Sequence, residues 1–147
     1  MRRRKLTIAL APLALLACAG SAVAATLAVT KTATCGCCAK WVEHMKKAGF
    51  NVTVRNVDDV TPTAQRLAVP DRLRSCHTSE IGGYAIEGHV PVADIKRLLA
   101  ERPKAAGIAV AGMVMGTPGM EHGDHKEAYR TILFDKAGNT RVFASHN

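Results

Sequence analysis

The chain has 147 residues and a formal net charge of +8, with basic residues concentrated at its start. Without the first 24 residues the net charge falls to +4, which is too small and too scattered to favour nucleic acid as a partner. The remaining 123 residues suffice for one domain with its own hydrophobic core.

The first 24 residues have the pattern of a secretory signal peptide. A run of basic residues precedes an apolar stretch from Leu6 to Cys18, and the small residues Ala22-Val23-Ala24 follow. The apolar stretch is shorter than the roughly 20 residues of a membrane span, so we expect no stable membrane insertion. We predict cleavage near Ala24 and a mature metal-binding domain, residues 25–147, in the periplasm.

A second interpretation of this region is a lipoprotein signal. Leu15-Leu16-Ala17-Cys18 resembles a lipobox, in which Cys18 would become a lipid-anchored N-terminus. The alternative location is therefore a membrane surface.

Three cysteines lie within four residues, Cys35-Gly36-Cys37-Cys38, shortly after a predicted strand at Leu27–Val29. Apolar residues follow at helical spacing, and Gly49 stands where a glycine typically ends a helix. We therefore place Cys35 near a helix N-terminus, where unpaired N–H groups and the helix dipole stabilise thiolate. Met45 belongs to the apolar face of this helix and is expected in the core.

The other predicted helices and strands supply the scaffold rather than candidate ligands. In chain order they are a strand at Phe50–Val57, a short helix starting at Thr61-Pro62 and ending before Pro70, two short strands around Gly82-Gly83, an amphipathic helix at Pro91–Arg102, an apolar run at Ile108–Ala111, and a hairpin of Thr131–Phe134 and Arg141–Ala144. Thr61 is expected to be the N-cap of its helix. This order predicts an α/β fold in which helices flank a central mixed sheet.

Two further segments contribute candidate ligands. Cys76 is followed directly by His77, and weak helix and strand signals before them predict a loop. The segment from Met113 to His125 contains three methionines and two histidines without helical periodicity, so we include Met113, Met120 and His122 as candidate ligands. The other histidines, with no partner in the sequence pattern, are expected at the surface: His44, His89 and His146.

The four cysteines after the signal peptide admit metal or redox chemistry. Exported thiols persist as disulfides, metal thiolates or cycling catalysts. Cys35 and Cys38 form a C-x-x-C pair, which is typical of thioredoxin-like redox motifs. Cys37 adds a competing thiol, and three sulfur atoms at one helix end suit a soft ion such as Cu(I). Purely structural disulfides are disfavoured because they would close few useful loops.

Together these segments resemble one family. The stretches are Cys35-Gly36-Cys37-Cys38-Ala39-Lys40-Trp41, Ser75-Cys76-His77-Thr78, Gly88-His89-Val90-Pro91 and Gly116-Thr117-Pro118-Gly119-Met120-Glu121. They are similar to the periplasmic CopG-like copper-resistance family, long known as a domain of unknown function and distinct from the plasmid repressor of that name. The resemblance spans roughly residues 27–144. It implies a thioredoxin-like fold, copper binding by the C-x-C-C cysteines and the later cysteine, and copper-efflux or copper-delivery proteins as partners.

The leading hypothesis is a periplasmic protein that holds Cu(I) in copper resistance or redox handling, with the number of ions left open. Its ligands are Cys35, Cys37, Cys38 and Cys76, supplemented by His77, Met113, Met120 and His122. One alternative is a thiol–disulfide oxidoreductase with Cys35 as nucleophile and Cys38 as resolving thiol. Another is a structural Cys₃His zinc site that uses Cys35, Cys37 or Cys38, Cys76 and His77.

Overall fold

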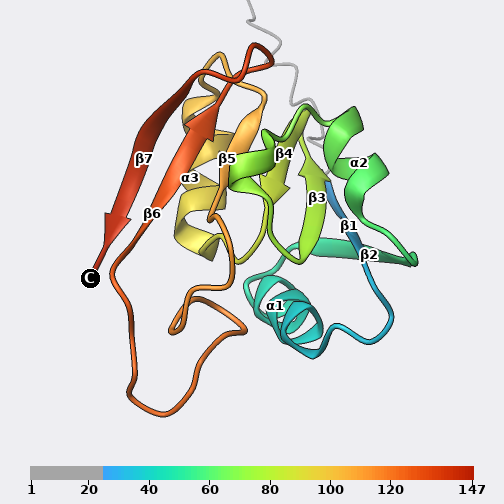
Figure 1. Ribbon diagram of the computed structural model, residues 1–147, viewed down its shortest axis with the longest axis vertical. Helices are drawn as coiled ribbons and strands as arrows, with labels where there is room; N and C mark the ends of the chain where they lie inside the picture. Colours follow the sequence, from blue (N-terminus) through green and yellow to red (C-terminus); the bar gives the residue numbers. More distant parts are fainter. Residues whose placement is uncertain (1–24) are drawn as a thin grey trace, which may run out of the picture.

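The computed structural model describes residues 25–147, so the predicted signal peptide and Cys18 lie outside the described residues. Seven strands form one sheet in the order β2-β1-β3-β4-β5-β6-β7 (Figure 1). The strands are β1 (Thr26–Lys31), β2 (Asn51–Asn56), β3 (His77–Ile81), β4 (Tyr84–Glu87), β5 (Gly107–Ala109), β6 (Tyr129–Phe134) and β7 (Thr140–His146). The helices are α1 (Gly36–Lys47), α2 (Thr61–Arg66) and α3 (Val92–Glu101), with a short 3₁₀ helix, η1 (Asp71–Leu73).

The sheet is mixed. β1 pairs in parallel with β2, as β4 does with β5, and the other neighbouring strands are antiparallel. The predicted α/β fold with a central mixed sheet and flanking helices is therefore confirmed. None of the helices within residues 25–147 has the length and apolar character needed to cross a bilayer.

Side chains on the two faces of the sheet form two separate cores. Ile86 and Ile108 join a core with α1 and α3, whereas their neighbours Ala85 and Ala109 join a smaller core with α2 and η1. Successive residues of a strand point to opposite faces. Thus α1 and α3 cover one face, and α2 with η1 covers the other.

Helix α1 has a glycine after its C-terminal end, Cys35 at its N-terminal end, and Trp41 among its fully buried side chains. Gly49 follows the C-cap with a positive φ of +90°, as predicted for a helix-ending glycine. Trp41 is fully buried, and its indole N–H donates to the carbonyl oxygen of Val90 at 2.9 Å. At the other end Cys35 is the N-cap, and no side chain caps the helix. The first N–H groups of α1 therefore lie beside the cysteines.

Two local predictions need correction. His77 does not lie on a loop, because it begins β3, between β1 and β4. The strand predicted before Gly82-Gly83 is β3, and it begins as early as His77, with the side chains of His77, Thr78 and Ser79 fully buried. The N-cap of α2 is Val60 rather than Thr61. A carboxylate oxygen of Asp59 instead accepts the Thr61 N–H at 2.8 Å.

The connection from β5 to β6 is a long loop, as predicted. Its one piece of strand-like pairing is an isolated bridge between His122 and His125. Figure 1 shows this connection running below the sheet, on the side of the molecule where α1 lies. The predicted hairpin follows it as β6 and β7. The loop is therefore placed to cover the cysteine end of the fold.

Candidate metal centre

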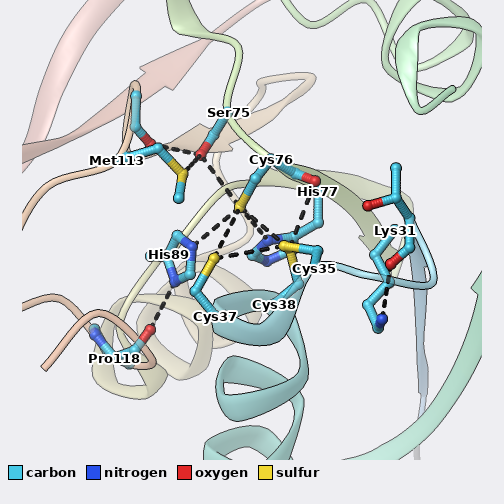
Figure 2. Close-up of a disulfide and its surroundings, with 12 residues drawn as sticks. Lys31, Cys35, Cys37, Cys38, Ser75, Cys76, His77, His89, Met113 and Pro118 are labelled. Atoms are coloured by element: carbon cyan, nitrogen blue, oxygen red, sulfur yellow. Dashed lines mark hydrogen bonds between the residues drawn. A yellow bond between two sulfur atoms is a disulfide. The ribbon is translucent and has the colours of Figure 1, made fainter.

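The register of the sheet brings Cys76 to the cysteine triplet. Lys31, at the end of β1, is paired with His77, at the start of β3. The chain reaches the N-terminus of α1 just after Lys31 and leaves Cys76 just before His77. The four sulfur atoms of Cys35, Cys37, Cys38 and Cys76 all lie within 4.8 Å of one another (Figure 2).

Two of these cysteines are joined and two are free. Cys35 and Cys38 form a disulfide, while Cys37 and Cys76 are free thiols. The Sγ atom of Cys76 lies 3.2 Å from Cys38 Sγ and 3.9 Å from Cys37 Sγ. Cys37 Sγ is in turn 3.5 Å from Cys35 Sγ. Cys76 therefore joins the cluster through direct contacts with the sulfur atoms of the first turn of α1.

Two imidazoles flank Cys76 (Figure 2). His89 Nε2 lies 3.1 Å and His77 Nδ1 lies 3.4 Å from Cys76 Sγ. The prediction of His89 at the surface was wrong, since only 1% of this residue is exposed. Cys76, His77 and His89 form a second group of side chains able to hold a metal ion. His89 lies in the turn between β4 and α3, where no periodicity signals an inward direction.

The second nitrogen of His89 fixes how the ring faces the thiol. Nδ1 lies 2.8 Å from the carbonyl oxygen of Pro118, and a carbonyl can only accept, so Nδ1 carries the proton. Burial lowers the pKa of His89, which favours the neutral ring. The Nε2 lone pair therefore points at Cys76. Metal-binding histidines commonly have this arrangement, with the other ring N–H bonded to a carbonyl or carboxylate.

His77 is buried and neutral. Burial is the main cause that lowers the pKa of His77 to about 3, and repulsion from Lys31, and from His89 whenever that ring is protonated, acts in the same direction. Its ring centroid lies 4.5 Å from that of Trp41, while Nε2 is buried with no hydrogen-bond partner among residues 25–147. Such unsatisfied buried atoms are rare in native proteins.

The surroundings of Cys76 favour its protonated form. Burial raises the pKa of Cys76 to about 12, and repulsion from the charge of Cys37 acts in the same direction. A bound cation reverses this preference, because it offsets the thiolate charge that burial disfavours. Metal binding at Cys76 would therefore release a proton.

The candidate ligands on the long loop lie at different depths. Met113 is 47% exposed, and its Sδ is 4.0 Å from the hydroxyl oxygen of Ser75. Met120 is half-buried next to Gly119, whereas His122 is exposed. Within residues 25–147, neither group of metal-binding side chains includes His122. The structure therefore brings together the four cysteines with His77 and His89, but not His122.

The remaining histidines lie outside this cluster. His44 is at the surface, as predicted, with Nε2 2.8 Å from a carboxylate oxygen of Glu121. His146 is partly buried rather than simply exposed, and its Nε2 lies 2.9 Å from the carboxylate of Asp94. The first pair ties the long loop to α1, and the second ties β7 to α3.

Comparison with known proteins extends these observations. A family model described as "Protein of unknown function, DUF411" matches residues 73–120. A solved structure described as copper resistance protein CopG, form 2, is 41% identical, covers 84% of this chain and 98% of its own, and has a TM-score of 0.80. The chain belongs to the CopG-like copper-resistance family. A second structure, CopG form 1, is 42% identical, covers 82% of this chain and 96% of its own, and has a TM-score of 0.78. A search of curated proteins found no match.

Membership of the CopG-like family confirms the resemblance seen in the sequence and the fold class that it implied. The DUF411 match includes Cys76, His77 and His89 but begins after the cysteine triplet. The CopG structures are similar over most of this chain and almost all of their own. The chain is thus related to copper resistance proteins and has a cysteine cluster that could hold a metal.

Gly119 lets the long loop of this CopG-like fold touch α1. Its φ is +85°, and an added Cβ would lie 2.7 Å from Cys37 O and from Trp41 N. We expect Gly119→Ala to lower the free energy of unfolding by about 1–3 kcal/mol, the usual cost of overpacking. Urea denaturation measures this loss.

The matched control for this prediction is Gly123→Ala. Gly123 also has a positive φ, of +57°, but an added Cβ would meet nothing within 4 Å. It therefore has a similar backbone cost without the collision. Equal stability of the two variants would contradict close packing of the loop on α1.

Proposed function

We propose that this chain binds Cu(I) through Cys35, Cys37, Cys38 and Cys76 and acts in copper resistance or in the redox handling of copper. The observation that carries the proposal is the convergence of four sulfur atoms within 4.8 Å. Thiolate and thioether ligands are the ones that Cu(I) prefers. The relationship to proteins described as copper resistance protein CopG supports the same metal.

His77 and His89 extend the proposed ligand set. Both rings direct a nitrogen at Cys76 Sγ, and His89 is already oriented by its bond to Pro118. If the His77 ring flipped, its unsatisfied Nε2 would face Cys76 Sγ in place of Nδ1 and would be able to bind the cation. His89 is thus an addition to the residues proposed from the sequence.

We further propose that the long loop supplies thioether ligands from Met113 and Met120. The loop is held over the cluster by the His89–Pro118 contact and by Gly119 on α1. His122 would join only if its exposed turn moved inward. We therefore leave His122 out of the principal ligand set.

The disulfide favours a second candidate function, a thiol–disulfide oxidoreductase. Cys35 and Cys38 are joined at the N-terminus of α1, where a thiolate is stabilised. The same sulfur atoms serve as metal ligands only after reduction. Redox activity and copper binding would therefore compete for the same cysteines. We propose that the protein acts in the periplasm, with copper-delivery or copper-efflux proteins as partners.

Competition with a calibrated Cu(I) chelator under anaerobic, reducing conditions tests copper binding. We expect Cu(I) to bind far more tightly than Zn²⁺, and we expect Cys37→Ser and Cys76→Ser each to weaken Cu(I) binding by at least about 10-fold. Met113→Leu should weaken it less. Met45→Leu is the matched control, because Met45 is a methionine of α1 that is fully buried in the hydrophobic core.

The outcomes separate the candidates. Unchanged Cu(I) affinity in both cysteine variants would reject the shared thiolate site. Preference for zinc at equal free-metal activity would support the structural zinc alternative instead. Disulfide exchange that persists after complete removal of copper, with unaltered copper binding in the variants, would favour the oxidoreductase.

A further inference from the structure

Glu87 is a buried carboxylate next to the segment that carries Cys76. It is the last residue of β4 and is fully buried. One carboxylate oxygen accepts the backbone N–H of Ser75 at 2.7 Å, and the other accepts the hydroxyl of Thr78 at 2.6 Å. Glu87 therefore holds the chain on both sides of Cys76 and His77.

The residue after Glu87 strengthens this attachment. The Gly88 N–H donates to the His77 carbonyl oxygen at 3.0 Å. An added Cβ on Gly88 would lie 2.6 Å from Ser75 Cβ and from Val110 O. The end of β4 thus packs directly on the chain that enters β3. A buried carboxylate is costly unless its bonds are satisfied, so its place in a β-strand is explained by these contacts.

Ser75 extends the attachment to the long loop. Its hydroxyl donates to the carbonyl oxygen of Gly112 at 2.5 Å. The Gly112 N–H donates in return to the carbonyl oxygen of Arg74 at 3.1 Å. These two bonds fix the residue before Met113 to the residues before Cys76. Figure 2 shows Ser75 between the side chains of Cys76 and Met113.

We propose that Glu87 is the positioning residue of the metal centre. It holds the Cys76 thiol against the α1 cysteines and, through Ser75, holds the Met113 thioether on the other side of the same cluster. This inference rests on the proposed function for its copper readout only. The geometric part concerns Cys76 and is measurable without any metal.

The first test is the alkylation rate of Cys76 in the reduced, metal-free protein, resolved by peptide mass analysis. We expect Glu87→Ala to speed alkylation of Cys76 relative to Cys37, because Cys76 loses its fixed, partly buried position. Glu87→Gln should recover most of the effect, since its amide oxygen can accept from Ser75 while its amide nitrogen donates to Thr78. Glu80→Ala, at a half-buried carboxylate on β3 that pairs with Arg66, is the matched control.

The second test is Cu(I) affinity. Loss of a residue that supports a metal ligand typically costs about 10–100-fold, and we expect this loss in Glu87→Ala. Ser75→Ala keeps the backbone bond to Glu87 but removes the bond to Gly112. It also removes the 4.0 Å contact of the hydroxyl with Cys76 Sγ, so this variant is read by copper affinity alone. Adding Met113→Leu to it should cause no further loss of affinity. Additive effects of these two substitutions would overturn the role of Ser75 in placing Met113.

These readouts distinguish the two levels of inference. Faster Cys76 alkylation in Glu87→Ala, in a protein whose wild type binds no copper, would support positioning and reject the proposed function. Unchanged alkylation and affinity in Glu87→Ala would overturn the positioning role. If Glu87→Ala does not fold, Thr78→Val takes its place, because it removes the hydrogen bond from the Thr78 hydroxyl to Glu87. Thr78→Val should then also speed Cys76 alkylation and weaken Cu(I) binding.

Discussion

Oxidation of the Cys35–Cys38 pair is expected to lower the Cu(I) affinity of the protein by at least about 100-fold. The disulfide would remove two of the four proposed sulfur ligands together with their charge. Loss of one supporting residue around a metal site already costs about 10–100-fold, so loss of two direct ligands should cost more. Chelator competition on the oxidised and the reduced protein, with free-thiol counting, measures the difference.

A methionine variant provides the control for this result. Met113→Leu should leave the rate of thiol oxidation unchanged, because thioethers take no part in disulfide exchange. Peptide mapping after trapping of free thiols identifies which cysteines have joined. Equal copper affinity in the oxidised and the reduced protein would mean that Cys35 and Cys38 are not copper ligands.

Acidification of the metal-free, reduced protein is expected to destabilise it through His77. Burial is the main reason that the pKa of His77 falls from 6.5 to about 3 in the folded protein. The unfolded chain takes up this proton below about pH 6.5, whereas the folded protein does so only near pH 3, so unfolding binds a proton in this window. The contribution of His77 to the free energy of unfolding should therefore fall by about 1.4 kcal/mol per pH unit from pH 6 to pH 4.

Urea denaturation at several pH values, with a chelator present, measures this slope in the wild type and in His77→Leu. Other buried groups also titrate here: burial lowers the pKa of His89 and raises that of Glu87. Because both groups remain in the variant, the difference between the two slopes isolates His77. Equal slopes would mean that His77 is not held neutral by burial.

Local sequence patterns predicted much of the fold. The apolar residues of α1 and α3 recur at helical spacing, and Gly49 ends α1 as expected. Each of these features depends on residues a few positions apart, where helical geometry is decided. The start of β3 at His77 was not predicted, because this polar part of the strand is held by hydrogen bonds to β1, which lies far away in sequence. A polar strand between two others has no local apolar alternation.

The candidate site likewise has one part that the sequence predicted and another that only the tertiary structure shows. Residue type and spacing alone determined that this chain has thiols suited to a soft metal or to redox chemistry, and that three of them lie at a helix N-terminus. The tertiary structure decided which distant groups meet them. The pairing of Lys31 with His77 delivers Cys76 to the triplet, and the turn after β4 points His89 inward. These contacts arise from strand register and packing across the fold, which spacing along the chain does not encode.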